Sequence, residues 1–335
     1  MSVTIKDVAK IAGVSYATVS RALNGHPEIN ANTKQRIVQI AKEMGYSPNA
    51  IARGLVKKNT NMIGLLVPDI RNPYFPEVAR GVEDFANSEG INVFLCNTNW
   101  EEKKEIIYIK ALREKRVEGL IIAPVTAVSH QRIKEENLKI PVVYIGSKSE
   151  DDNENFVILD NFKAAFTATE YLIGLGHDNI AFVGGFESSI SNTDRVRGYR
   201  EALKKHNLEK EINLVKSSSF KRESGYAIAL EFINEGRVPS GILAANDIIA
   251  LGVIEAFENN GYTVPEDISV IGFDDISFAS LPKINLTTIA QPKYQMGAAA
   301  AQMLVQMIGS SGNKEIMNHY IVEPELIIRG TCRKR

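Results

Sequence analysis

Residues 5–25, IKDVAKIAGVSYATVSRALNG, decide the fold of the N-terminal part of this 335-residue chain. Residue types that begin and end short helices punctuate this stretch, namely Thr4, Gly13, Ser15 and Asn24-Gly25. They predict helices over 5–12 and 16–23, joined by a three-residue turn that contains glycine. This pattern is a helix-turn-helix, whose second helix protrudes far enough to enter a DNA major groove.

A third helix is predicted to start at Asn32 or Thr33 and to run to Met44, before Gly45. Apolar residues recur at helical spacing in all three segments, namely Val8, Ala9, Ala12, Val19, Leu23, Ile37, Ile40 and Ala41. We therefore expect them to form one small core.

The charge of the chain is unevenly distributed. Residues 1–60 carry nine bases and three acids, whereas the whole chain has 39 bases and 40 acids. A small basic segment on a large acidic body indicates a head that binds a polyanion. Charge alone leaves open a chance cluster of solvated lysines and arginines, so the placement of the bases decides.

The stretch 5–25 is very similar to the DNA-binding head of the lactose/galactose repressor (LacI/GalR) family. The resemblance implies that Tyr16, Ala17 and Arg21 face base edges. Arginine bonds a guanine bidentately, and the alanine methyl suits thymine. The side chains suited to phosphate are Thr4, Ser15, Thr18, Ser20 and Asn24. Some of these hydroxyls have an alternative role as helix caps only.

The next stretch, residues 46–60, reads YSPNAIARGLVKKNT. Pro48 suits the first position of a helix, but two turns with Gly54 inside are marginal in water. The stretch resembles the hinge helix of the same family, which wedges paired leucines into the minor groove. That resemblance implies DNA contacts from Asn49, Ala52, Arg53 and Leu55, with Leu55 as the wedge.

From Met62 onward, short apolar runs alternate with amphipathic stretches. The runs predict strands at 62–68, 92–97, 119–123, 142–146, 156–159, 180–184, 241–245 and 268–272. Helical patterns are found at 77–89, 101–116, 161–175, 194–206, 223–235, 247–259 and 293–308. This alternation predicts an α/β fold with parallel, doubly wound sheets. Since about 270 residues is long for one such sheet, we expect two lobes.

This part is similar to the two-lobed periplasmic sugar-binding-protein fold, which forms the regulatory core of the same family. The resemblance places the crossings between lobes near residues 160, 290 and 321. The implied domains are a head at 1–47, a hinge at 48–61, one lobe at 62–160 with 291–321, and another at 161–290 with 322–330.

Side chains suited to a sugar follow the ends of the predicted strands. Proteins hold carbohydrates with aromatic faces and with charged or amide groups that bond paired hydroxyls. The candidates are Asn72, Tyr74, Phe75, Arg195, Phe220, Asn246, Asp274 and Gln291. The set resembles ligand motifs of ribose-type binding proteins and is closest to ribose-operon repressors, which implies ribose or another pentose.

Two observations weaken this assignment. The binding proteins place charged groups after the strand that matches 119–123, whereas this chain continues Pro124-Val125-Thr126. Taken singly, Phe75 and Phe220 suit a core equally well, and Asp274 suits a helix cap. It is the joint presence of the candidates at successive strand ends that favours a ligand site.

The patterns of other protein classes are missing from the sequence. There is no long apolar run for a membrane span, and the N-terminus lacks a signal peptide, so we expect a cytoplasmic protein. The two cysteines and five histidines have no metal-ligand spacing, and no nucleophile motif occurs. We expect neither a cofactor nor an enzyme.

The resemblance implies a homodimeric repressor that reads a pseudo-palindromic operator and responds to a sugar. The implied dimer contacts are Leu251, Ile254 and Leu281. Control by a phosphocarrier protein remains an alternative, as does a corepressor in place of an inducer.

Overall fold

The computed structural model describes residues 3–24, 26–46, 60–148, 154–208, 214–310 and 319–335. The chain divides into two compact units, a head at Met1–Asn61 and a body at Met62–Arg335. Each unit has its own hydrophobic core within the described residues.

The head contains three helices, α1 (Ile5–Ala12), α2 (Tyr16–Leu23) and α3 (Ala31–Glu43). The predicted bounds of α1 and α2 are confirmed, because local caps set them. Asp7 accepts hydrogen bonds from the Thr4 amide and hydroxyl, at 2.8 and 2.7 Å. Gly13 ends α1 with a left-handed φ of 65°. The Ser15 hydroxyl accepts a bond from the Thr18 amide at 3.1 Å and starts α2.

The third helix and the core differ slightly from the prediction. The helix starts at Ala31 because the Asn30 side chain caps it, accepting a bond from the Asn32 amide at 2.9 Å. Ala22 is fully buried, whereas Leu23 and Ile40, expected in the core, are half-buried at its edge. The predicted helix-turn-helix is confirmed.

The first lobe of the body is built on a parallel sheet with the strand order β11-β5-β4-β3-β1-β2. Its strands are β1 (Met62–Val67), β2 (Asn92–Asn97), β3 (Leu120–Ile122), β4 (Val142–Ile145), β5 (Asn155–Leu159) and β11 (His319–Val322). The helices of this lobe are α5 (Tyr74–Ser88), α6 (Glu102–Glu114), α7 (Ala127–Glu135) and α12 (Lys293–Gly309).

The second lobe has the strand order β12-β10-β9-β8-β6-β7. Its strands are β6 (Ile180–Gly184), β7 (Val215–Ser217), β8 (Gly241–Ala244), β9 (Ser269–Asp274), β10 (Thr287–Ala290) and β12 (Glu325–Ile327). The helices are α8 (Asn161–Gly174), α9 (Ile190–Lys205), α10 (Arg222–Asn234) and α11 (Asp247–Asn259). The edge strand β12 runs antiparallel to β10, so this sheet is mostly parallel.

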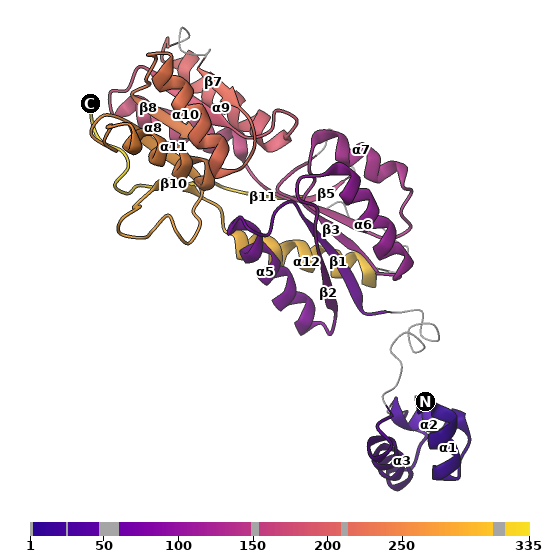
Figure 1. The fold of residues 1–335 in the computed structure, drawn as a ribbon. Helices are drawn as coiled ribbons and strands as arrows, with labels where there is room; N and C mark the ends of the chain where they lie inside the picture. Colours follow the sequence, from indigo (N-terminus) through magenta and orange to yellow (C-terminus); the bar gives the residue numbers. More distant parts are fainter. Residues whose placement is uncertain (1–2, 25, 47–59, 149–153, 209–213, 311–318) are drawn as a thin grey trace. The chain divides into compact units, whose positions relative to one another are not determined.

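The chain changes lobe after β5, after β10 and after β11. Figure 1 shows the result of the second change: α12, in yellow, lies beside α5, which is far from it in sequence, and it also packs against β4. The third change follows Val322, one residue later than the position implied by the resemblance. Residues 331–335 also pack on the second lobe, where the Arg335 amide donates to the Leu175 carbonyl.

Several elements of the body were not predicted, namely α7, β7, β10, β11 and β12. They are short, and α7 is mostly polar, so neither helical nor strand periodicity is strong in them. Two helices also begin earlier than predicted. The helix α5 starts at Tyr74, after the Asn72 side chain accepts a bond from the Tyr74 amide, and α9 starts at Ile190 behind its cap Ser189.

Two glycines, Gly81 on α5 and Gly297 on α12, let these helices approach closely. A Cβ on Gly297 would lie 2.1 Å from the Val78 carbonyl oxygen, whereas a Cβ on Gly309 of the same helix meets nothing within 4 Å. We expect Gly297→Ala to destabilise the protein by about 1–3 kcal/mol, because backbone atoms cannot yield as side chains do. Gly309→Ala should be neutral or slightly stabilising. Urea unfolding of both variants checks this, and equal stabilities would contradict it.

Candidate functional site

A pocket lies between the strand ends of the two lobes. The first lobe lines it with Pro68, Asn72, Tyr74, Phe75, Val78, Trp100, Ala123, Pro124, Thr126, Ile145, Gly146 and Ser147. The second lobe lines it with Asn161, Ser189, Ile190, Ser191, Arg195, Phe220, Asn246 and Asp274, and Gln291 lies at a crossing. Its volume of about 80 Å³ is several times what one water molecule needs. The pocket therefore has room for a small molecule.

All eight effector-site candidates from the sequence line this one pocket. They come from strand ends of both sheets, as the rule for open α/β folds predicts. Arg195 and Asp274 are the only charged residues among those lining it. The strand end at Pro124–Thr126 adds no charge, and the Thr126 hydroxyl instead donates to Glu102 at 2.7 Å.

Arg195 projects from α9 and is 6% exposed. Its Nε donates to the Asn161 side chain at 2.8 Å, its Nη1 donates to the Ala245 carbonyl, and its guanidinium carbon lies 3.5 Å from the Phe273 ring centre. Burial lowers the pKa of Arg195, while the carboxylate of Asp274 acts in the opposite direction. These contacts fix the guanidinium at the pocket wall, and its remaining N–H groups are donors for a ligand.

Asp274 ends β9 and is also buried, at 5% exposure. Burial raises the pKa of this carboxyl to about 6, against the opposing effects of Arg195, Lys293 and Gln291. Oδ1 accepts a bond from Gln291 Nε2 at 2.7 Å. No ion pair joins Asp274 to Arg195 in the described structure, so Oδ2 is an acceptor for a ligand.

The backbone at Asp274 is strained. Its φ is 114° and that of Asp275 is 51°. Residues other than glycine rarely adopt positive φ angles. The Lys293 ammonium holds this turn by donating to both carbonyls at 2.7 Å. Below it, buried Asp247 accepts a bond from the Ile276 amide at 2.8 Å, and burial raises the pKa of Asp247. Strain held by such contacts is typical of ligand sites.

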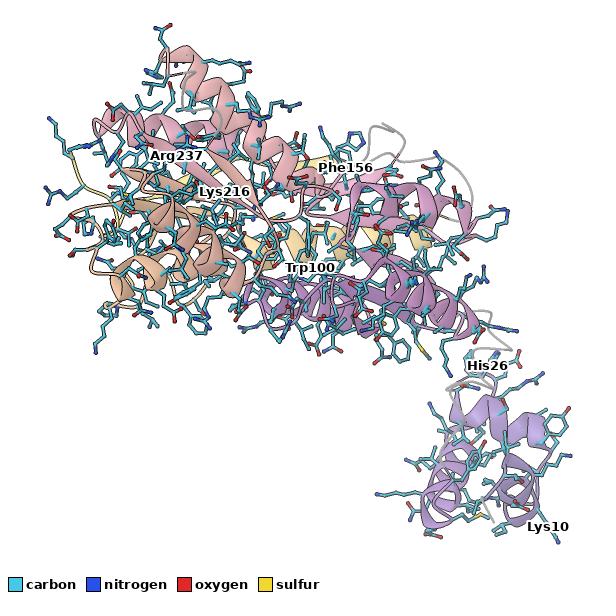
Figure 2. The ribbon with its side chains drawn as sticks, turned by 45° about the horizontal axis from the view of Figure 1, so that its top comes forward. Lys10, His26, Trp100, Phe156, Lys216 and Arg237 are labelled. Atoms are coloured by element: carbon cyan, nitrogen blue, oxygen red, sulfur yellow. The ribbon has the colours of Figure 1, made fainter. Side chains whose placement is uncertain are left out.

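Aromatic rings form the other walls. Tyr74 donates its hydroxyl to Gln291 at 3.4 Å, and burial raises its pKa. Phe75 and Phe220 belong to the cores of their lobes and also line the pocket, so both sequence interpretations describe them. Figure 2 labels Trp100 where the lobes meet. It stacks on Phe220 with ring centres 5.0 Å apart and an interplanar angle of 19°.

Two amide candidates also support local structure. Asn246 caps α11 by accepting a bond from the Ile249 amide at 2.7 Å, and its amide nitrogen lies 3.4 Å from the Phe220 carbonyl. Asn72 precedes α5 and accepts a bond from the Tyr74 amide at 3.0 Å. Both still line the pocket, although part of their hydrogen-bonding capacity is used inside the protein.

The sequence analysis missed Trp100, Asn161 and Ser147, which line the pocket as well. Each follows a strand of the first sheet within a few residues: β2 precedes Trp100, β5 precedes Asn161 and β4 precedes Ser147. Polar and aromatic residues beyond strand ends were the available signal.

In the head, the predicted DNA-contacting residues lie on and around α2. Tyr16, Ala17 and Arg21 are exposed, and Arg21 lies 3.6 Å from the equally exposed Glu28 carboxylate. The hydroxyls of Ser15 and Thr18 bond each other at 2.9 Å, and Asn24 donates to the Ser20 carbonyl at 2.8 Å. Ser15 and Thr4 therefore stabilise helix starts, whether or not they also hold phosphate. Asn49, Ala52, Arg53 and Leu55 lie outside the described residues.

The predicted dimer residues lie on the second lobe. Leu251 and Ile254 are half-buried on α11 and line one groove, whereas Leu281 is 47% exposed.

The described residues contain no group of three metal-ligating side chains. The described helices also include none that is both long enough and apolar enough to cross a membrane.

Two family models match the chain. Residues 4–49 match "Bacterial regulatory proteins, lacI family". Residues 60–328 match "Periplasmic binding proteins and sugar binding domain of LacI family".

Curated relatives align over nearly the full length. Catabolite control protein A of Priestia megaterium is 35% identical over 96% of this chain and 96% of its own. The ribose operon repressor of Halalkalibacterium halodurans is 36% identical over 98% and 97%.

Solved structures agree with this. The lac repressor dimer bound to operator and the anti-inducer ONPF has a TM-score of 0.87 at 27% identity, covering 99% of this chain and 100% of that one. A LacI-family regulator of Enterococcus faecium with bound ribose has a TM-score of 0.73 at 29% identity, covering 82% and 99%. The chain therefore belongs to the LacI family, whose members are transcriptional regulators and not enzymes, with a helix-turn-helix head and a two-lobed sugar-binding body.

Proposed function

We propose that this regulator is a homodimeric repressor whose affinity for a pseudo-palindromic operator is set by a small sugar, ribose or another pentose. The observation that carries the proposal is the pocket in which Arg195 and Asp274 are buried beside aromatic rings without forming an ion pair with each other. A guanidinium that donates and a carboxylate that accepts suit adjacent hydroxyls, and ring faces suit sugar C–H groups.

The similarity to a ribose operon repressor and to a structure with bound ribose supports a pentose. The similarity to the lac repressor dimer supports a two-fold assembly, with Leu251, Ile254 and Leu281 at the seam. In this proposal Tyr16, Ala17 and Arg21 read bases, and the hinge at 48–61 links them to the lobes.

The proposed sugar acts as an inducer by favouring an arrangement of the lobes that releases the operator. A coupling of about 1–3 kcal/mol between the two sites gives roughly 5–150-fold weaker operator binding. Calorimetry with ribose, arabinose, xylose, glucose and their phosphates tests whether the protein binds a sugar. Operator titration with and without the bound sugar tests whether the sugar weakens operator binding. An operator affinity that no sugar changes would refute the proposal.

Control by a phosphocarrier protein is the second candidate, favoured by the similarity to catabolite control protein A. The two candidates differ in what they bind. Absence of heat with every sugar, together with binding of a phosphorylated carrier protein, would select the second one. Tighter operator binding in the presence of sugar would instead identify a corepressor.

Sugar binding should weaken below pH 6. The raised pKa of about 6 means that Asp274 takes up a proton in the empty pocket as the pH falls. Binding to the ionised carboxylate must then release that proton, so affinity should fall by up to about tenfold per pH unit. Calorimetry from pH 8 to pH 5 measures this, and Asp274→Asn should bind weakly with a flat profile.

The stability of the sugar-free protein should depend on pH in the opposite direction, falling as the pH rises. A carboxyl whose pKa is higher in the folded state than its ordinary 3.8 binds more protons when folded, so its contribution to stability is present at low pH and is lost as the pH rises through about 6. Comparing the unfolding of wild type and Asp274→Asn across this range isolates that contribution. Parallel curves would show that Asp274 does not titrate there.

A further inference from the structure

Ser147, His130 and Glu154 form a hydrogen-bonded chain that starts in the pocket and is not used above. His130, on α7, is 3% exposed, and its Nε2 lies 3.1 Å from the Ser147 hydroxyl. Its Nδ1 lies 2.7 Å from a carboxylate oxygen of Glu154, and the Tyr144 ring packs against the imidazole with centres 4.2 Å apart. Ser147 follows β4 and lines the pocket, so buried His130 and half-buried Glu154 support a residue at the ligand surface.

We propose that this pair fixes the Ser147 hydroxyl as a hydrogen-bond acceptor toward the effector and thereby makes Ser147 a specificity-determining residue. The proposal rests on the proposed sugar-binding function of the pocket. His130 and Glu154 act as positioning residues, because neither lines the pocket.

The direction of the hydroxyl follows from counting protons. A carboxylate only accepts, so the hydrogen between Glu154 and His130 belongs to Nδ1. A neutral imidazole has one N–H, and its Nε2 is then an acceptor. In this neutral form the Ser147 hydroxyl donates to Nε2, and only the lone pairs of its oxygen are left for the ligand.

The same order of residue types activates a nucleophile in hydrolases. In this regulator the arrangement fixes a direction, and the proposal includes no covalent step.

The consequence is a third hydrogen-bonding group in the pocket whose direction is fixed. Arg195 only donates and Asp274 only accepts when ionised, and Ser147 becomes a second acceptor. The ligand must therefore carry a donor opposite Ser147, such as a free hydroxyl. An ether, a fluorine or a phosphate ester at that position places an acceptor against an acceptor and is disfavoured. The effector class is thus a sugar whose hydroxyl opposite Ser147 is free.

The first test needs no sugar. Nitrogen-15 spectra of the full chain, labelled at its five histidines and recorded at pH 8, distinguish the two neutral tautomers from the imidazolium. The wild-type signal that is absent from the His130→Gln spectrum belongs to His130. It should report a proton on Nδ1 alone, and Glu154→Gln should shift it. His206→Gln is the control, since this exposed histidine pairs with Glu170 at 2.9 Å away from the pocket lining. A proton on Nε2, or on both nitrogens, overturns the proposal.

The second test uses D-ribose and its deoxy and deoxyfluoro analogues at positions 2, 3 and 5, titrated calorimetrically at pH 8. At one position, both the deoxy and the fluoro analogue should bind about 3–10-fold more weakly than ribose, because one neutral hydrogen bond is lost. In Ser147→Ala this difference should disappear, whereas Ser88→Ala, on an exposed serine of α5, should keep it. Glu154→Gln should reduce the discrimination against fluorine, because an amide permits either tautomer.

The outcomes separate the two proposals. A fluoro analogue that binds as well as ribose where the deoxy analogue does not would show that Ser147 donates, and this overturns the inference. If no sugar of the series binds, the proposed function fails and the specificity role fails with it, while the spectra still decide the direction of the hydroxyl. Thermal unfolding of each variant shows that it is folded.

Discussion

Replacing Arg195 with alanine is expected to give a repressor that holds its operator whether or not sugar is present. The guanidinium is buried at the pocket wall and is held by Asn161 and the Ala245 carbonyl, so its loss removes preorganised donors. Each hydrogen bond to a charged group contributes about 1.5–3 kcal/mol, so losing two should weaken sugar binding by at least about 100-fold. Operator binding without sugar should be unchanged, because the head carries no part of the pocket.

A matched control lies on the same helix. Arg197 is exposed and pairs with Asp194 at 3.1 Å, and surface pairs of this kind contribute little to stability. Arg197→Ala should therefore induce normally. Trp100 is the only tryptophan and stacks on Phe220 at the pocket, so its fluorescence should report sugar binding in each variant.

Arg195→Ala also removes the donors for two buried acceptors, so it is expected to lower stability. Asp274→Asn is the milder partner, because it keeps the size of the side chain and the bond to Gln291. Both variants should lose induction. Normal induction in Asp274→Asn would remove this carboxylate from the site, and loss of operator binding without sugar would indicate a corepressor.

The three helices of the head at 5–43 were predicted almost completely because their ends are decided locally. Thr4, Gly13 and Ser15 set helix ends through contacts within a few residues, and such contacts can be read from sequence. The start of α3 was missed because two neighbouring residues, Asn30 and Asn32, both suit a cap, and only the structure shows that Asn30 takes this role.

The pocket was predicted in part. Its eight candidates stand at or after strand ends, which a parallel α/β topology brings together at one edge of each sheet. Trp100 was missed because its partner Phe220 belongs to the other lobe.

The hydrogen bonds that join Ser147, His130 and Glu154 were missed for a similar reason. They depend on α7, a short polar helix with weak periodicity, whose His130 contacts one residue after β4 and one residue before β5. Sequence spacing does not report contacts of this kind, because they depend on how the elements pack.

Replacing Arg21 with alanine should weaken specific operator binding much more than nonspecific DNA binding. Arg21 is exposed in the last turn of α2, and its nearest acid, Glu28, is also exposed, so the side chain is available to a base edge. A bidentate contact to guanine contributes about 1–3 kcal/mol of discrimination, and a dimer makes it twice. Specific binding should thus weaken by roughly 30-fold or more, whereas binding to a scrambled duplex should lose only one charge contact per head.

The experiment first defines the operator by selection from random duplexes with the wild-type protein. Fluorescence anisotropy then measures the affinity of Arg21→Ala for the selected and the scrambled duplexes across a salt series. Lys42→Ala is the matched control, because it removes one exposed positive charge from α3 of the same head. This variant should weaken binding to both duplexes equally or not at all, since a charge without base contacts carries no sequence information. If Arg21→Ala behaves in the same way as Lys42→Ala, then Arg21 contacts phosphate only, and base recognition must come from Tyr16, Ala17 or the hinge.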